Sequence, residues 1–230
     1  MTTSKNPKSH EDWNQFSGKA IPGSIPLQPI FFEKVYPGHS LVDIGCGAGR
    51  ICFDLLKRGY GPITGVDQNE DGIRIAREKL RDMDADHPDR CQFEKRDALQ
   101  TGFEDQAFDA GVILAMLTTF TTPETRLQVL REARRIIRRG GGLYLTEFMQ
   151  TWHHPLYYER YLQGEQETGV WGSFFAVDKS GSIALQAHHF TERELVDLLH
   201  EAGFAISHWE YSKVRTQTGK TINGAVIWAI

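Results

Sequence analysis

Residues 40–50 read Ser-Leu-Val-Asp-Ile-Gly-Cys-Gly-Ala-Gly-Arg, a short apolar stretch followed by glycines at positions 45, 47 and 49. Glycines at alternate positions let the backbone turn sharply and let a ligand approach the main chain closely. The next residues, 50–60, place several apolar side chains on one face of a helix. The stretch therefore predicts a strand, a glycine-rich turn and a helix whose N-terminus favours an anionic or hydrogen-bond-accepting group.

The spacing of these glycines separates two classes of cofactor. A dinucleotide-binding turn reads G-x-G-x-x-G, whereas this chain has G-x-G-x-G followed by Arg50, with Asp43 two residues before the first glycine. A second acidic residue, Asp67, ends the next apolar stretch, 20 residues after Gly47. A carboxylate there can accept both hydroxyls of a ribose in either class. Asp67 therefore indicates a nucleoside, and the glycine spacing argues against a nicotinamide oxidoreductase, which stays a rival.

Outward from this turn, strand and helix patterns alternate. Strands are expected at 40–45, 62–67, 90–98, 108–117 and 142–148, and helices at 27–36, 50–60, 69–80 and 123–139. Such alternation predicts a parallel sheet with helices on both faces, whose strand C-terminal ends meet at one ligand-binding edge.

The pattern changes after the fifth strand. Residues 149–190 are rich in aromatic residues and histidine, and we expect them to form an inserted cap. Regular structure resumes at Thr191, where Thr-Glu-Arg-Glu is a capping box that pairs Thr191 with Glu194 ahead of a helix ending at Gly203. Two final strands, 205–214 and 221–230, are expected to form a hairpin around residues 218–220.

The composition is that of an ordinary globular protein. Of 230 residues, 40% are hydrophobic and 24% charged, which excludes a disordered or collagen-like chain. The length favours one elaborated domain. Its expected parts are an N-terminal arm or lid at 1–37, a cofactor-binding half at 38–148, an acceptor-side insertion at 149–190, and a C-terminal helix and hairpin at 191–230.

Charge and hydropathy limit the partners and the compartment. The formal net charge is -4, so nothing global predicts a nucleic-acid-binding surface. The longest apolar run, 110–117, is too short to cross a membrane. No signal-peptide core is present at the start. The cysteines at 46, 52 and 91 have no metal-ligand or redox spacing, which predicts free thiols in a reducing cytoplasm.

Four motifs in order resemble the class I S-adenosylmethionine-dependent methyltransferases. They are Asp-Ile-Gly-Cys-Gly-Ala-Gly at 43–49, Gly-Val-Asp at 65–67, Arg-Asp-Ala at 96–98 and Phe-Asp at 108–109. The resemblance is close over 38–148 and looser through the last helix and hairpin. It implies a doubly wound, mainly parallel seven-stranded α/β sheet, with the last strand antiparallel between the fifth and sixth. It also implies S-adenosylmethionine as cofactor and S-adenosylhomocysteine as product.

The resemblance assigns cofactor-binding roles to particular residues. The glycine turn would cradle the methionine part, Asp67 the ribose, and the residues after the third strand the adenine. The residues concerned are Asp43, Gly45, Cys46, Gly47 and Gly49 for the methionine part, Asp67 with Gln68 beside the adenine, Asp97 with Ala98 at the adenine amino group, and Leu114 and Met116 near the methyl group.

The chain departs from the family pattern at two turns. Arg138-Arg139-Gly140 replaces the frequent Lys-Pro-Gly before the fifth strand, away from the chemistry. At the exit of the fourth strand, residues 114–117 read Leu-Ala-Met-Leu. Methyltransferases acting on adenine or glutamine amino groups typically carry an Asn- or Asp-Pro-Pro-aromatic tetrad there, so the exit argues against those acceptors.

The acceptor is expected to meet the insertion 149–190 and the arm, where Trp13, Phe16 and Lys19 would close over the cofactor or simply pack. A general base helps if the acceptor is a hydroxyl or a protonated amine, and histidine suits neutral pH. The general-base candidates are His153, His154 and His189.

The paired histidines also have two alternative roles. The first is hydrogen bonding inside a half-buried lid. The second is a metal site, which is disfavoured because no carboxylate or cysteine completes a ligand set. The candidate acceptor-pocket residues, which equally suit the small core of the insertion, are Trp152, Tyr157, Tyr158, Tyr161, Trp171 and His188.

The sequence therefore predicts a cytoplasmic methyltransferase that acts on an O, N or S atom of a small molecule, because a 42-residue insertion suits a compact acceptor better than a polymer. An RNA or protein methyltransferase and a non-catalytic S-adenosylmethionine-binding protein stay as alternatives. The basic residues of 123–139 are interpreted as a solvated face that complements the helix dipole, with a nucleic-acid patch as the alternative. No metal or membrane is expected, and nothing in the sequence sets an oligomeric state.

Overall fold

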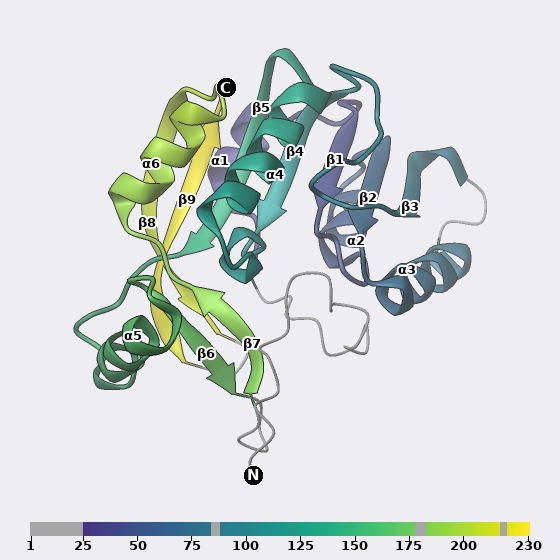
Figure 1. Cartoon of the computed structure of the whole chain (residues 1–230). Helices are drawn as coiled ribbons and strands as arrows, with labels where there is room; N and C mark the ends of the chain where they lie inside the picture. The colour runs from purple at the N-terminus through teal and green to yellow at the C-terminus, as the bar shows by residue number, and fades with distance from the viewer. Residues whose placement is uncertain (1–24, 84–87, 178–182, 217–219) are drawn as a thin grey trace.

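The computed structural model describes residues 25–83, 88–177, 183–216 and 220–230. Seven strands form one twisted sheet in the order β3-β2-β1-β4-β5-β9-β8 (Figure 1). Their bounds are β1 Leu41–Ile44, β2 Ile63–Asp67, β3 Cys91–Lys95, β4 Phe108–Leu114, β5 Ile137–Phe148, β8 Ile206–Arg215 and β9 Thr221–Ala229. β1 to β5 are mutually parallel, and β9 runs antiparallel between β5 and β8. This order confirms the expected seven-stranded sheet with its C-terminal hairpin.

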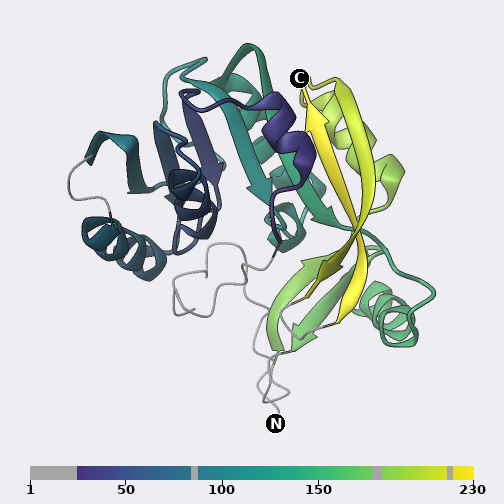
Figure 2. The same ribbon diagram turned by 180° about the vertical axis from the view of Figure 1, so that it is seen from behind.

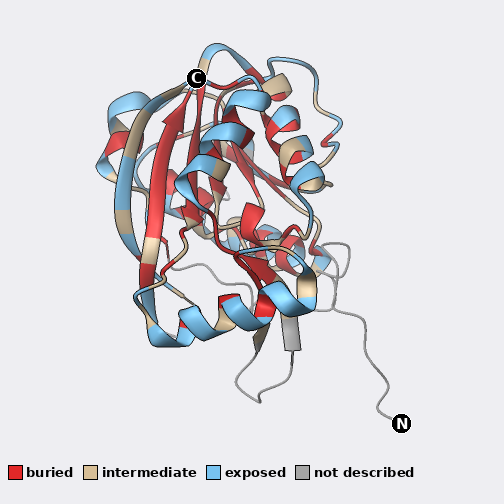
Figure 3. Cartoon of the chain, turned by 60° about the vertical axis from the view of Figure 1, so that its left-hand side comes forward, coloured by how far each residue is buried: buried red, intermediate tan, exposed pale blue. Residues whose placement is uncertain are grey.

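Helices cover both faces of the sheet because the strand side chains are apolar on both sides. α4 (Pro123–Ile136) and α6 (Glu192–Glu201) pack on one face, against Leu143 and Leu145. α1 (Pro29–Lys34) and α2 (Arg50–Lys57) pack on the opposite face, where Tyr144 lies (Figure 2). α3 (Glu70–Met83) flanks β2 and β3, and two short 3-10 turns, η3 (Pro88–Arg90) and η4 (Leu117–Thr119), follow α3 and β4. Figure 3 shows the resulting layers, with buried residues in the strands and on the inward helix faces.

α4 ends three residues earlier than the sequence suggested. Thr122 caps it through a side-chain bond from Thr125 N, and Pro123 opens it, as expected. The expected end at Arg139 is wrong, because Ile137 is buried, pairs with Phe108 and begins β5. The glycines after Arg139 therefore belong to the strand, and the left-handed φ of +78° at Gly140 accommodates an irregular start rather than a helix stop.

The segment after β5 folds into a helix and a two-stranded sheet of its own. α5 (Pro155–Thr168) packs on β6 (Ser173–Val177), and β6 pairs antiparallel with β7 (Ile183–His188). The helix approaches the strand closely at Gly164, where a Cβ would lie 1.9 Å from the Ser173 carbonyl oxygen. We call α5, β6 and β7 the cap. It lies beyond the C-terminal ends of the parallel strands (Figures 1 and 2).

The capping box at the start of α6 is only half formed. The Thr191 hydroxyl accepts a hydrogen bond from Glu194 N at 3.2 Å, as expected. The Glu194 carboxylate does not return to the backbone of Thr191. It lies against His188 and Arg126 instead, because two buried groups compete for it.

Some expectations lie outside the described residues, namely those on Trp13, Phe16 and Lys19 and on the tip of the final hairpin at 217–219. Within the described residues, no helix combines the length and the apolar character that crossing a membrane requires. No cluster of three or more His, Cys, Asp or Glu side chains in that part of the chain has a metal-binding arrangement.

Candidate cofactor and acceptor site

The predicted cofactor residues meet at one edge of the sheet. The carbonyl of Val66 accepts hydrogen bonds from Gly45 N at 2.8 Å and from Cys46 N at 3.0 Å. The carbonyl of Asp67 in turn accepts one from Arg96 N at 3.1 Å. These bonds continue the parallel ladders past the strand ends, so the residues that follow β1, β2 and β3 are held side by side.

The turn after β1 needs glycine for backbone reasons. Gly45, Gly47 and Gly49 have φ of +82°, +54° and +78°, a region that side chains disfavour. A Cβ at Gly45 would lie 2.5 Å from Met116 Sδ. At Gly49 it would lie 2.6 Å from the Phe93 ring. Side chains of the protein itself therefore fill the space beside two of the glycines, and Met116 links the turn to the exit of β4.

Asp67 fits the expected ribose-binding role. Its two carboxylate oxygens accept hydrogen bonds from Gly47 N and Asn69 N, each at 2.8 Å. A carboxylate offers about four lone-pair sites, and with Gln68 as a third donor one site remains for a ribose hydroxyl. Burial raises the pKa of Asp67, while the hydrogen bonds from Asn69, Gly47 and Gln68 act to lower it. The site therefore fits the nucleoside part of S-adenosylmethionine.

Asp43 is buried at the end of β1 and accepts a hydrogen bond from Cys52 Sγ at 3.4 Å. Burial raises its pKa to about 7. Cys46, Cys52 and Cys91, distant in the sequence, all pack in the same apolar cluster as buried free thiols. Burial raises the pKa of Cys46 and Cys52, so these thiols are protonated packing groups.

The residues expected at the adenine and at the methyl group lie at the same edge. Gln68, Asp97, Ala98 and Leu114 are half-buried. Asp97 turns back on its own loop, where it accepts a hydrogen bond from Leu99 N at 2.9 Å. The structure thus brings these residues to the edge that holds the glycine turn, and their contacts with a cofactor remain a prediction.

The exit of β4 has unusual backbone geometry. Ala115 has φ of +48° and donates its N–H to the Thr146 carbonyl at 2.7 Å. Two residues on, Leu117 N donates to Glu147 Oε1 at 2.7 Å. Glu147 is buried, and burial raises its pKa to about 8. A left-handed alanine held by such bonds is a local strain of the kind found at functional sites.

The aromatic residues of the insertion divide into two groups. Tyr157, Tyr161 and Phe174 are buried and form the core of the cap. Trp152 stacks on Trp171 with ring centroids 4.7 Å apart. Trp171 is exposed, as is Tyr158, whose ring meets that of Trp152 edge-on with centroids 5.9 Å apart. Tyr157 and Tyr161 therefore belong to the small core of the insertion, which is one of the two roles expected for them.

The four histidines also differ in surroundings. His153 is exposed and His154 half-buried at the start of α5. His188 and His189 are buried. Nδ1 of His189 is 2.7 Å from the Tyr161 hydroxyl, which also accepts from Thr151 N. Burial lowers the pKa of His189 to about 3, so the ring is neutral near pH 7. His188 and His189 thus form hydrogen bonds inside the cap, as the lid alternative expected. A base role for His153, His154 or His189 remains a prediction.

Sequence reasoning missed two buried charged residues next to the exit of β4, Arg126 and Glu147, and gave Glu194 only a capping role. Arg126 was interpreted as part of a solvated face, but it is fully buried. Its place in the apolar stripe with Val129, Leu130 and Ala133 was the available signal. Glu147, an acid inside an otherwise apolar strand, was another signal.

Comparisons with known proteins identify the family of the chain. A family model described as a methyltransferase domain matches residues 41–141. 27-O-demethylrifamycin SV methyltransferase of Amycolatopsis mediterranei is 33% identical over 129 residues, 56% of this chain and 43% of the relative. A ubiquinone/menaquinone biosynthesis C-methyltransferase of Roseobacter denitrificans is 34% identical over 114 residues, 49% of this chain and 44% of the relative. The matched part thus spans less than half of the length of these curated relatives.

A solved structure gives a longer match. It is that of a SAM-dependent methyltransferase of Methanosarcina mazei, with a TM-score of 0.84 and 37% sequence identity. The match covers 89% of this chain and 98% of that one. With the order of the seven strands and the glycine turn after β1, this full-length likeness shows that the chain belongs to the class I S-adenosylmethionine-dependent methyltransferases.

Proposed function

We propose that this protein transfers a methyl group from S-adenosylmethionine to an O, N or S atom of a small-molecule acceptor. The observation that carries the proposal is the position of the cap. Its apolar cluster includes Tyr157 and Phe174 and contacts Ala115 at the exit of β4 and Phe148 at the end of β5. A folded cap at this edge supports an enclosed acceptor, since an open groove for a polymer would leave the same edge free.

The chain's own residues would hold the cofactor at the strand ends. The sulfonium of the bound cofactor supplies the activated methyl group. Asp67 would accept a ribose hydroxyl through its remaining lone pair, and the backbone of the glycine turn would lie against the methionine part. Ile25 lies close to this turn, because its carbonyl accepts a hydrogen bond from Arg50. Positioning of donor against acceptor, with water excluded, supplies much of the rate of such a displacement.

A proton has to leave if the acceptor is a hydroxyl or a protonated amine. His189 is a poor base at neutral pH because burial lowers its pKa to about 3. His154 keeps a buried Nδ1 with no hydrogen-bond partner among the described residues. Of the three histidines, His154 is therefore the base we propose for such acceptors, and a thiolate or free amine needs none.

Two other acceptors are second candidates. A relative is named as a C-methyltransferase, which favours carbon as an alternative acceptor atom in a small molecule. Other relatives are named as probable tRNA methyltransferases, which keeps RNA as a candidate. The net charge of -4 and the cap both favour the small molecule.

Transfer of a tritium-labelled methyl group tests the proposal. The protein and labelled S-adenosylmethionine are incubated separately with the metabolite, RNA and protein fractions of a cell extract. We expect label in the metabolite fraction, and its loss in the Asp67→Ala variant. Label in the RNA or protein fraction alone would contradict the small-molecule assignment. Tight S-adenosylhomocysteine binding with no label in any fraction would favour a non-catalytic binding protein.

A further inference from the structure

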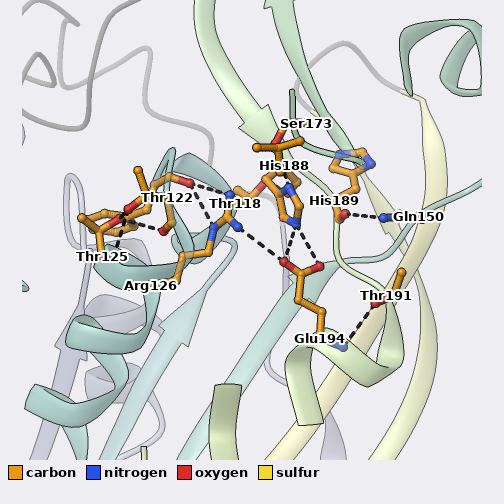
Figure 4. Close-up of polar contacts among 12 residues, drawn as sticks. Thr118, Thr122, Thr125, Arg126, Gln150, Ser173, His188, His189, Thr191 and Glu194 are labelled. Carbon is orange, nitrogen blue, oxygen red and sulfur yellow. Dashed lines mark hydrogen bonds and ion pairs between the residues drawn. The ribbon is translucent and has the colours of Figure 1, made fainter. Parts of the chain in front are cut away.

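A largely buried network of polar side chains joins α6 to the cap and to α4 (Figure 4). The Glu194 carboxylate lies 2.8 Å from His188 Nε2 on β7. The same carboxylate lies 3.4 Å from Arg126 Nη1 on α4. His188 and Arg126 are almost fully buried, whereas the Glu194 side chain is 28% exposed. One carboxylate therefore satisfies two groups that come from different parts of the chain.

At the cap end of this network, His188 is held through both its side chain and its backbone. Nδ1 of His188 is 2.9 Å from the Ser173 hydroxyl, which joins β7 to β6. The backbone carbonyl of His188 accepts a hydrogen bond from Thr118 Oγ1 at 2.6 Å. Thr118 belongs to η4, the turn that follows β4. His188 thus connects the cap hairpin directly to the exit of β4.

At the other end of the network, Arg126 also contacts the segment that follows β4. Arg126 Nε and Nη2 donate to the Phe120 carbonyl at 3.0 and 2.8 Å. Among the described residues, Arg126 makes its one ion pair with Glu194. The segment 117–120 is therefore fixed by buried bonds at its start, through Leu117 and Glu147, and at its end, through Arg126.

The exit of β4 adjoins the cofactor turn. Met116, next to this segment, packs its Sδ over Gly45, and the cap's core meets Ala115. A displacement of 117–120 relative to the cap would therefore change the distance between a donor at the glycine turn and an acceptor under the cap. Reaction rates are sensitive to misplacement of this kind.

We propose that Glu194 is a positioning residue for methyl transfer: through His188 and Arg126 it holds the cap hairpin and the exit of β4 in one fixed arrangement. The inference rests on the proposed function. Glu194 lies outside the predicted cofactor residues, so its loss is expected to disturb the acceptor side while the glycine turn and Asp67 keep their geometry.

The test compares Glu194→Gln with Asp197→Asn, an exposed acid on the same helix that pairs only with the exposed Arg193 among the described residues. Amide hydrogen exchange is followed at 117–120, at 183–190 and, as reference, in β1 and β2. Binding of S-adenosylhomocysteine is measured by calorimetry on the same proteins. Thr118→Val, which removes the bond to His188 without changing charge, is the second variant should Glu194→Gln fold poorly.

We expect Glu194→Gln to accelerate exchange in both acceptor-side segments by about tenfold or more. β1 and β2 should stay protected, the affinity for S-adenosylhomocysteine should stay within about threefold, and Asp197→Asn should match the wild type. Given an acceptor, kcat should fall while the KM for S-adenosylmethionine holds. Unchanged exchange at 117–120, or equal acceleration in β1 and β2, would overturn the proposal. Failure of the wild type to bind S-adenosylhomocysteine would instead count against the proposed function, and the exchange data on the unliganded protein would still decide the role of Glu194.

Discussion

Asp67 Oδ2 accepts a hydrogen bond from the backbone N–H of Gly47 at 2.8 Å, which joins the end of β2 to the glycine-rich turn after β1. Two features that lie 20 residues apart in the sequence therefore form one rigid unit. The same carboxylate is the group we expect to receive the ribose. Asp67 thus both shapes the turn and presents the polar atoms that a nucleoside needs.

Replacement of Asp67 by alanine should weaken S-adenosylhomocysteine binding strongly. Hydrogen bonds to a charged group contribute about 1.5–3 kcal/mol, which corresponds to roughly a tenfold to hundredfold increase in Kd. Isothermal titration measures this change. Glu70→Gln, which alters a fully exposed acid three residues further on, is the control and should bind as the wild type does. Equal affinities for Asp67→Ala and the wild type would remove Asp67 from the cofactor site.

Gly49→Ala and Gly59→Ala separate steric crowding from backbone strain. Both glycines have left-handed φ, +78° and +87°. A Cβ at Gly49 would meet the Phe93 and Phe53 rings, whereas nothing lies within 4 Å of one at Gly59. Both variants should lose about 1–2 kcal/mol for the backbone, and Gly49→Ala about 1–3 kcal/mol more for crowding. Urea unfolding measures both, and equal losses would show that the rings yield freely.

Glu147→Gln should change the pH dependence of stability. Burial raises the pKa of Glu147 from 4.5 to about 8, so the folded protein holds a proton that the unfolded chain loses at lower pH. The free energy of unfolding therefore falls as pH rises between these two values, with a slope of up to about 1.4 kcal/mol per pH unit. Glutamine has no proton to lose and keeps an oxygen for Leu117 N.

The measurement for Glu147 is urea unfolding of both proteins at several pH values from 5 to about 8.5. Glu147→Gln should gain stability relative to the wild type as pH rises. Asp43 titrates in the same direction in both proteins, so the difference between them isolates Glu147. A difference that stays constant across this range would contradict the raised pKa.

Tyr161→Phe tests the core of the cap. The tyrosine hydroxyl serves both Thr151 N and His189 Nδ1, and its loss leaves two buried polar groups without a partner. We expect a loss of about 1–3 kcal/mol in the free energy of unfolding. Tyr158→Phe, on the exposed side of the same helix, should stay within about 0.5 kcal/mol of the wild type. Equal stability of the two variants would mean that water replaces the Tyr161 hydroxyl.

The sheet and the cofactor edge were predictable because their signals are local. A few neighbouring residues are enough to recognise each apolar strand, the glycine turn and the acids that end β1 and β2. The strand order then follows from the parallel connections. The overextended end of α4 shows the limit of local reading. Ile137 belongs to a strand only because Phe108 pairs with it.

The cap and the buried charges depend on long-range contacts and were not predictable in detail. α5 carries three tyrosines, of which Tyr157 and Tyr161 are buried and Tyr158 is exposed. Leu156 and Leu162 of the same helix are exposed as well, so the apolar residues do not mark a single buried face. Glu194 fits a capping box by sequence. Its carboxylate contacts Arg126, 68 residues earlier, and His188, six residues earlier. The capping-box pattern predicts neither contact, because both depend on how the cap and α4 pack against α6.

The central claim is that the glycine turn and Asp67 bind S-adenosylmethionine rather than a dinucleotide. Calorimetric titration of the wild-type protein with S-adenosylhomocysteine, and separately with NAD, tests it most directly. We expect S-adenosylhomocysteine to bind at one site per chain and NAD to give no heat of binding. Binding of NAD without binding of S-adenosylhomocysteine would contradict it.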